Sequence, residues 1–437
     1  MNLFKFILLL KGFNLEKGYQ DLKKIQSLCE NDFSEWQEEQ KWSVFKYHFN
    51  NNLLFRSKMK GVMPSTWESI PIMTKNDLQV ALDKVLTPGT KKSDLYIGNT
   101  SGSSGHPFFF AKNKSCHSLT YGIIKDRYKR HGIELGEKQA RFYGIPLTKK
   151  ENIKERVKDF FANRVRFPVF DLSDPVLECY LNRFRSIKFK YIYGYTSAIL
   201  LFARFLAKKN IRLKHECPSL KVCFVTSEMC SIEDKLVMEN AFGCKVINEY
   251  GASELDFIAI EDEGGDWIIT EETLYIEILD QHNVPVLPGE EGKIVITSLF
   301  NKAMPFIRYE VGDMGVLSKQ KKGRYRILQS LTGRTNDFAV LPSGKKAAGL
   351  TFYYISKSLL EANGVMKEFI VKQVKMDTFL YEYVADRELS EDEKTSVKNM
   401  MNIYLEPGLI AHFNRLKVIE RSGSGKLKHF HSLLNNK

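Results

Sequence analysis

The chain has 437 residues, 43% of them hydrophobic and 27% charged, which suffices for a large buried core and for two or more domains. Its net charge is +13, yet the basic residues are dispersed and are interrupted by acidic blocks such as Glu261–Asp266. We therefore expect anionic small molecules as partners and no nucleic acid. No apolar stretch is long enough to cross a bilayer, so we expect no integral membrane span and a cytoplasmic location.

The N-terminal run MNLFKFILLLKG is apolar, but it ends at Lys11 and no cleavage signal follows. It predicts an amphipathic helix that either packs on the body of the protein or rests loosely on a membrane surface. Further along, Phe45, Phe49 and Leu53 recur at helical spacing, and Thr74 is placed to cap a helix that begins at Lys75.

The stretch YIGNTSGSSGHPFFFAK, residues 96–112, is the most informative part of the chain. Its middle is rich in glycine and hydroxyl groups, and its apolar flanks predict strand, loop, strand. Backbone amides and hydroxyls in such a turn can converge on a phosphate. The run lacks the residue order of the usual P-loop, and a flexible surface loop is the alternative interpretation.

From residue 117 to residue 254, helices and strands alternate, which predicts an α/β fold with parallel pairing. Two of the strands end in polar turns, Thr226–Glu228 and Glu249–Glu254, and ligands gather at the carboxyl ends of parallel strands. The predicted helices are His117–Arg130, Glu151–Phe161, Ser197–Lys209 and Glu233–Phe242, and the predicted strands are Arg141–Ile145, Phe189–Tyr193, Leu220–Thr226 and Lys245–Asn248.

The pattern changes after Trp267 to short strands separated by turns, which predicts a small antiparallel sheet or distorted barrel up to Leu317. This region contains Pro305–Asp313, PFIRYEVGD. A mixed α/β segment follows Gly333–Asp337, GRTND, and near its end lies Ser422–Lys428, SGSGKLK.

Seven cysteines are scattered through the chain without a C-x-x-C pair. Cys217, Cys223, Cys230 and Cys244 could supply four zinc ligands, but their spacing is irregular. We favour free thiols in a reducing compartment.

The motifs TSGSSG, YGASE, RYEVGD, GRTND and SGSGK follow one another in an order that resembles the adenylate-forming superfamily, which comprises acyl-CoA synthetases, adenylation domains and luciferases. The segments IPIMTK, YGIPL and ITSLFNKAMPFIRYEVGD are similar to the phenylacetate–CoA ligase branch, including members with capsular-polysaccharide functions and those once called coenzyme F390 synthetases. The resemblance covers residues 96–428.

The resemblance implies an α/β fold with a large N-terminal domain, residues 1–333, that binds ATP and the acid. This domain would contain parallel α/β sheets and a small antiparallel β-barrel. Residues 334–437 would form a small, mobile α+β domain that carries a catalytic lysine. Where the family usually has aspartate at the hinge, this chain has Asn336, followed by Asp337, which leaves the second half-reaction in question.

The resemblance also assigns residues to ATP. Glu254 would ligate Mg²⁺, which prefers carboxylate oxygen beside phosphates. Tyr250 would pack on the adenine, followed in the same motif by Gly251 and Ser253, and Asp313 would accept hydrogen bonds from the ribose. The glycine-rich run would hold the β- and γ-phosphates through Thr100, Ser101, Gly102, Ser103, Ser104 and Gly105.

Four further positions complete the predicted site. Ser227 and Glu228 would line the adenine pocket, and Arg334 would reach the ribose or a phosphate. Lys426 would bridge the acyl carboxylate and the α-phosphate in catalysis. A carboxylate is already ionised near neutral pH, so the reaction needs positioning and charge neutralisation rather than a general base.

The implied function is ATP-dependent activation of a small carboxylic acid as an acyl-adenylate, followed by transfer to coenzyme A. One alternative is transfer to an amine in surface-polysaccharide synthesis, and another is a nucleotide-binding protein without catalysis. We also allow for a homodimer. The acid is not identified by the sequence. Tyr143 and Tyr195 would either line an acyl pocket or pack in a core. Phe108–Phe110 and Tyr193 would suit an aromatic or apolar acyl group, but aromatic residues in strands can also serve packing alone.

Overall fold

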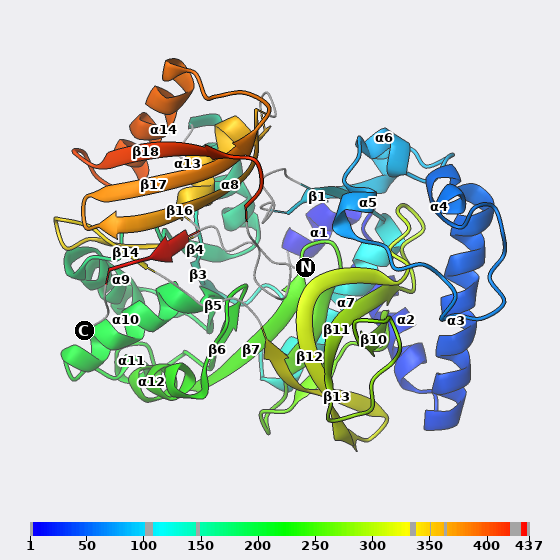
Figure 1. Cartoon of the computed structure of the whole chain (residues 1–437). Coiled ribbons are helices and arrows are strands. Elements are labelled where there is room, and N and C mark those ends of the chain that lie inside the picture. Colours follow the sequence, from blue (N-terminus) through cyan, green and yellow to red (C-terminus); the bar gives the residue numbers. More distant parts are fainter. Residues whose placement is uncertain are drawn as a thin grey trace. The chain divides into compact units, whose positions relative to one another are not determined.

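A computed structural model describes residues 3–100, 108–145, 149–332, 338–349, 351–361, 365–419 and 430–434. The chain divides into two compact units (Figure 1). Unit 1 comprises residues 1–100, 108–135 and 249–333, and unit 2 comprises residues 101–107, 136–248 and 334–437. Both units mix helices and strands, so the predicted α/β fold class is confirmed. That residues 334–437 move as a separate domain stays a prediction.

Unit 1 begins with helices that pack around a large apolar core. The long helix α3 buries Phe45 and Phe49 in that core, as their helical spacing predicts. Thr74 caps α5 with a reciprocal capping box to Asp77. The helices of this unit are α1 (Leu3–Leu10), α2 (Leu15–Gln26), α3 (Glu30–Asn51), α4 (Leu53–Lys58), α5 (Lys75–Leu78), α6 (Leu82–Val85), the 3₁₀ helix Lys92–Asp94 and α7 (Lys114–Arg130).

The two strands predicted on either side of the glycine-rich run are confirmed, while residues 101–107 between them lie outside the described residues. Strand β1 (Leu95–Asn99) pairs antiparallel with β2 (Phe109–Asn113). Phe108 and Phe110 are fully buried in the core of unit 1, so packing explains these two aromatic residues, while Phe109 is exposed.

The second part of unit 1 is antiparallel, as predicted for the region after Trp267. Its strands are ordered β10-β11-β12-β13-β9-β8-β7, with β8 pairing antiparallel to the end of β7 (Lys245–Ala252). The bounds are β8 (Asp256–Glu261), β9 (Trp267–Ile269), β10 (Leu274–Leu279), β11 (Glu291–Ser298), β12 (Tyr309–Lys322) and β13 (Tyr325–Thr332).

Unit 2 contains a parallel sheet in the order β4-β3-β5-β6, in which the pairs β3–β4, β3–β5 and β5–β6 are all parallel. One face packs on helices α9 to α12 around Phe142, Phe167 and Ile192 (Figure 1). The elements are β3 (Gln139–Phe142), α8 (Lys149–Phe161), β4 (Arg164–Phe167), α9 (Asp174–Ser186), β5 (Tyr191–Tyr195), α10 (Thr196–Lys208), α11 (Leu213–Glu216), β6 (Val222–Thr226), α12 (Ile232–Phe242) and β7 (Lys245–Ala252).

The C-terminal part of unit 2 is an α+β arrangement. A four-stranded sheet in the order β18-β17-β16-β19 packs on helices around Phe352, Tyr381 and Phe430. The elements are β14 (Phe338–Val340), β15 (Lys346–Ala348), α13 (Thr351–Glu361), β16 (Met366–Lys375), β17 (Thr378–Ala385), α14 (Glu391–Tyr404), β18 (Ile410–Leu416) and β19 (Phe430–Ser432).

Some predicted strand bounds were wrong, because hydrogen bonding to neighbouring strands decides where a strand begins and ends. The strand predicted at Phe189–Tyr193 is Tyr191–Tyr195, in register with β3 and β6. The strand predicted to end at Asn248 continues to Ala252, since Gly251 and Ala252 pair with β8. Strand β4 and helix α9 were not predicted at all.

The buried side chain of His48 in unit 1 should make the stability of the fold depend on pH. Its side chain is fully buried, its Nε2 donates to the carbonyl oxygen of Asn301 at 2.8 Å, and its Nδ1 lies 3.1 Å from Thr87 Oγ1. Burial lowers its pKa from 6.5 to about 4. The unfolded chain therefore takes up a proton between pH 6.5 and pH 4 that the folded chain does not, so acid weakens the fold.

We expect the free energy of unfolding to rise with pH across this window, with up to about 1.4 kcal/mol per pH unit coming from His48. Urea denaturation of the protein at several pH values measures how the free energy of unfolding changes per pH unit. His48→Gln should flatten this slope, whereas the exposed control His282→Gln should leave it unchanged. Equal slopes for the wild type and His48→Gln would show that folding does not lower the pKa of His48.

Candidate functional site

Glu254 in unit 1 is a buried carboxylate held by a tyrosine. It lies in the turn between β7 and β8 and is 7% exposed. The hydroxyl of Tyr309, at the start of β12, donates to Glu254 Oε1 at 3.0 Å. In the part of the chain that the structure describes, Oε2 of this carboxylate has no hydrogen-bond donor, so Glu254 keeps an oxygen that can bind a cation or a ligand.

Asp313 is held in the same way by Tyr250. The Tyr250 hydroxyl donates to Asp313 Oδ2 at 2.9 Å, and Asp313 is 6% exposed. The ring of Tyr250 also stacks on Trp267, with centroids 6.2 Å apart. The structure thus brings together three residues that the sequence assigned to one site, Tyr250, Glu254 and Asp313.

Both phenols remain hydrogen-bond donors over a wide pH range. Burial raises the pKa of Tyr250, and the nearby charge of Glu254 raises it further. Burial and Glu254 also raise the pKa of Tyr309 well above its usual value. Because the phenols keep their protons, the two carboxylates act as hydrogen-bond acceptors, which is the form that a cation or a ribose hydroxyl requires.

The turn that carries Glu254 is fixed by Lys112 from β2. Lys112 is 1% exposed, pairs with Asp256 at 2.6 Å and donates to the carbonyl oxygen of Ser253 at 3.2 Å. Gly251 lies so close to this turn that a Cβ there would come 2.5 Å from the backbone oxygen of Asp256. Ser253 therefore contributes its backbone to the turn, and Gly251 is needed for a close backbone approach.

Arg308 ties the RYEVGD motif to the IPIMTK segment. The fully buried Arg308 pairs with Glu277, with Nη2 and Oε1 3.1 Å apart, and its Nη1 donates to the carbonyl oxygens of Glu68 and Ile70, each at 2.7 Å. The backbone of Met73 bonds to both Arg308 and Glu310. These contacts fix the position of Tyr309 and, through it, of Glu254.

Thr100 is the described member of the predicted phosphate loop. Its amide donates to the carbonyl oxygen of Phe108 at 3.0 Å, which closes the ends of the loop, and Lys75 Nζ lies 3.5 Å from its hydroxyl. Lys75 from IPIMTK thus brings a positive charge to the start of the loop. The sequence did not assign it a role.

Ser227 and Glu228 belong to unit 2, where they follow β6. Ser227 has a positive φ of 70°, and Glu228 Oε2 accepts a hydrogen bond from the amide of Ser197 at 2.7 Å. Burial raises the pKa of Glu228. Its carboxylate therefore caps helix α10, and its assignment to an adenine pocket stays a prediction.

Several predicted residues lie outside the described part of the chain, and their roles stay predictions. They are Ser101, Gly102, Ser103, Ser104, Gly105, Arg334, Asn336, Asp337 and Lys426.

The described residues contain no cluster of three or more histidine, cysteine or acidic side chains that could hold a metal ion without further ligands. All seven cysteines are free thiols, and Cys217 and Cys223 are buried. Among the described helices, none has the length and apolar character to traverse a bilayer.

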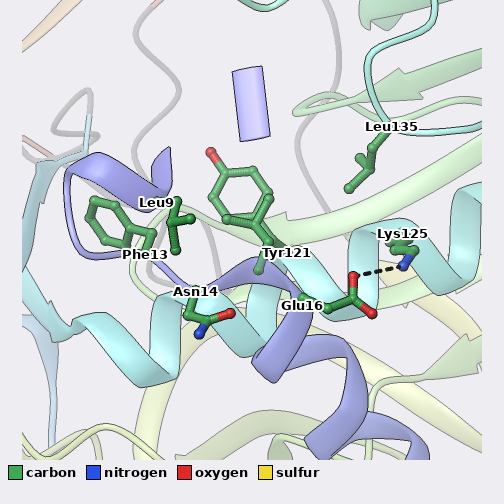
Figure 2. Close-up of a pocket in the computed structure, with 8 residues that line it drawn as sticks. Leu9, Phe13, Asn14, Glu16, Tyr121, Lys125 and Leu135 are labelled. Atoms are coloured by element: carbon green, nitrogen blue, oxygen red, sulfur yellow. Dashed lines mark ion pairs between the residues drawn. The ribbon is translucent and has the colours of Figure 1, made fainter. Parts of the chain in front are cut away.

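A small cavity of about 120 Å³ lies in unit 1 near α1, between Phe13, Asn14 and Tyr121, with Glu16 and Lys125 paired at 3.6 Å at one side (Figure 2). Ligand pockets for nucleotide-sized molecules span roughly 300–1,000 Å³. This cavity is too small for ATP or coenzyme A, and no role is assigned to it.

Comparison with known proteins agrees with the motifs. No family model matches the chain. Protein CapK of Staphylococcus aureus is 23% identical over 334 residues, which cover 73% of this chain and 71% of that protein. The phenylacetate-coenzyme A ligase of Aromatoleum evansii is 25% identical over 336 residues, covering 74% of each chain.

Among solved structures, 2-hydroxyisobutyryl-CoA ligase in complex with 2-HIB-AMP and CoA matches with a TM-score of 0.60 at 17% identity, over 91% of this chain and 89% of that chain. The chain therefore has the same fold as this CoA ligase. Its sequence is similar to CapK and to the phenylacetate-coenzyme A ligases, which confirms the resemblance seen in the motifs.

Proposed function

We propose that this chain is an ATP-dependent acid ligase that forms an acyl-adenylate and then passes the acyl group to coenzyme A. The observation that carries the proposal is the pairing of Glu254 with Tyr309 and of Asp313 with Tyr250 in unit 1. These are the carboxylates that the family motifs assign to Mg²⁺ and ribose. Similarity to named phenylacetate-coenzyme A ligases supports the proposal.

In the first step, an oxygen of the substrate carboxylate attacks the α-phosphorus of ATP. The bond from this phosphorus to the β-phosphate oxygen breaks, and pyrophosphate leaves with the bonding electrons. Asp313 would orient the ribose, Tyr250 would pack on the adenine, and Thr100 with Lys75 would bind phosphate oxygens. In the second step the sulfur of coenzyme A attacks the acyl carbon, AMP leaves, and the thiol proton goes to solvent.

The residues present fit Mg²⁺. Glu254 offers one carboxylate with an oxygen not committed to Tyr309, and Mg²⁺ in such sites typically uses one or two carboxylates together with substrate phosphates. Bound there, Mg²⁺ would supply charge neutralisation for the leaving pyrophosphate.

Transfer to an amine instead of coenzyme A is the second candidate. The similarity to CapK favours it, because the sequence resembles the branch that includes capsular-polysaccharide members. Mass analysis of products formed with coenzyme A and with amine acceptors separates the two. A cytoplasmic location and a homodimer remain predictions of the same proposal.

Acid-dependent ATP–pyrophosphate exchange tests the function itself. With Mg²⁺ and a broad acid panel, at least one acid should give exchange above the acid-free rate. A thermal-shift screen of the same acids with ATP and Mg²⁺ selects candidates, because a ligand of the folded state raises its apparent stability. Tight ATP binding without exchange for any acid would favour the catalytically inactive alternative.

Tyr309→Phe should weaken catalysis by releasing Glu254. The variant loses one hydrogen bond to a charged group but keeps the ring that packs on Phe306. We expect kcat/KM for exchange to fall about 10- to 100-fold, and the Mg²⁺ concentration for half-maximal rate to rise.

The control is Tyr383→Phe, which removes a similar tyrosine–glutamate bond, to Glu388, in the C-terminal sheet. This variant should keep the parent Mg²⁺ dependence. An unchanged Mg²⁺ dependence in Tyr309→Phe would contradict the assignment of Glu254.

A further inference from the structure

Helix α8 of unit 2 carries large apolar side chains on its outer face. Ile153, Val157 and Phe160 are 54%, 48% and 75% exposed. At 3.6 residues per turn, their spacing places them within about 60° of one another around the helix axis, so they form one continuous row, the α8 stripe. Single exposed apolar residues are ordinary, but a row of them on one helix face marks a surface that contacts an apolar partner.

The opposite face of α8 is held on the protein by charge. Asp159 is buried and pairs with Arg164 and, at 2.7 Å, with Arg166 of β4. Glu155, on the same side of the helix, pairs with Arg166 at 3.0 Å. A surface helix of a globular protein normally turns its apolar stripe to the core and its charged residues to solvent. In α8 this order is reversed, so packing inside unit 2 does not account for the α8 stripe.

Basic side chains border the α8 stripe on both sides. By helical spacing, Lys150 and Lys154 lie along one edge of the stripe and Arg156 along the other, and all three residues are exposed. Among the α8 side chains whose exposure the structure describes, Glu151 is the only exposed carboxylate. The outer face of the helix is therefore apolar along its centre and predominantly basic along its edges.

We propose that α8 docks unit 2 on an anionic lipid surface through Ile153, Val157 and Phe160. Helices with bulky apolar residues on one face and lysine or arginine beside them lie in the plane of a membrane surface. The apolar side chains enter the boundary between head groups and acyl chains, while the basic side chains reach the anionic head groups. Because one short stripe buries little apolar area, the docking is reversible, and it does not depend on the proposed ligase function.

A second copy of the chain fits the same surface less well. Two copies that met symmetrically through α8 would bring the basic edges of both α8 stripes together, and like charges repel. Anionic head groups instead supply the opposite charge along both edges at once. Charge complementarity therefore favours a lipid surface over self-association as the partner of this face.

Cosedimentation with lipid vesicles tests the proposal. The wild-type protein should bind mixed vesicles of phosphatidylglycerol and phosphatidylcholine at least about tenfold more tightly than vesicles of phosphatidylcholine alone, and added salt should reduce this difference. Phe160→Ser should lower the affinity for the mixed vesicles by about tenfold or more. The matched control is Ile232→Ser in α12, because Ile232 is also 75% exposed but is followed by the acidic Glu233 and Asp234. This control should bind as the wild type does.

A second variant separates the charge from the apolar contact. Lys154→Gln should weaken binding to the mixed vesicles and leave binding to phosphatidylcholine vesicles unchanged, and both substituted side chains are exposed, so neither variant should alter the fold. Equal affinity of the wild type and Phe160→Ser for the mixed vesicles would overturn the proposal, because the general basic surface would then bind the lipid. A wild type that binds no vesicles would also overturn it, and a dimer in ultracentrifugation that Phe160→Ser dissociates would then assign the α8 stripe to a second copy.

Discussion

Lys426→Ala is expected to reduce acyl-adenylate formation by about 10²–10³-fold, comparable to the loss of one preorganised charge-stabilising donor. Its ammonium would neutralise charge where the carboxylate meets the α-phosphate, and this interaction strengthens as the new bond forms. It would therefore act in the transition state rather than in ground-state binding. ATP affinity should change little, because the proposed nucleotide contacts of Thr100, Tyr250 and Asp313 would remain. ATP–pyrophosphate exchange measures the rate of acyl-adenylate formation, and calorimetry measures the affinity for ATP.

The same variant should keep the second half-reaction. When residues 334–437 swing, Lys426 would leave the phosphates, so acyl transfer from presynthesised acyl-AMP should proceed at nearly the parent rate. Lys428→Ala, two residues further along the same stretch, is the matched control for loss of a lysine. An equal loss of both half-reactions in Lys426→Ala, or of neither, would contradict both the lysine assignment and the movement of the C-terminal domain.

Arg308→Met should cost about 3–5 kcal/mol of unfolding free energy, because it leaves the carboxylate of Glu277 buried without its partner. Arg308 is fully buried, and Glu277 is 7% exposed. The double variant Arg308→Met/Glu277→Leu removes the orphaned charge and should be less destabilised than Arg308→Met alone.

Urea denaturation measures the unfolding free energies of both variants, and Arg204→Met serves as the control. Arg204 forms an exposed pair with Asp234 at 3.4 Å, so its loss should change stability by less than about 1 kcal/mol. If Arg308→Met proved as mild as Arg204→Met, the buried pair would not hold the RYEVGD motif to the segment around Ile70.

The sequence was sufficient to predict the features that depend on local residue patterns and on the order of the motifs. The alternation of helices and strands predicted the fold class, and YGASE and RYEVGD predicted that Tyr250, Glu254 and Asp313 serve one site. The hairpin around the glycine-rich run could also be predicted, because the turn residues and aromatic flanks lie within a few residues of each other.

Contacts between distant parts of the chain could not be predicted. Lys112 and Asp256 are far apart in sequence, and so are Met73 and Tyr309, yet these pairs fix the turn and the strand that carry the site. The pairing of Arg141 with Arg166 and with Tyr193 depends on the register of three strands, which the sequence alone does not determine. The hydrogen bond from the amide of Ser197 in α10 to Glu228 is another such contact, which the motif around Glu228 did not indicate.

Isotope transfer tests the central claim, formation of an acyl-adenylate, most directly. The acid that gives the strongest exchange is labelled with ¹⁸O in its carboxylate and incubated with ATP, Mg²⁺ and coenzyme A. Attack of the carboxylate on the α-phosphorus places one labelled oxygen in AMP after acyl transfer, so mass analysis should find AMP with one ¹⁸O and unlabelled pyrophosphate. Label in orthophosphate, with ADP as the nucleotide product, would contradict the account.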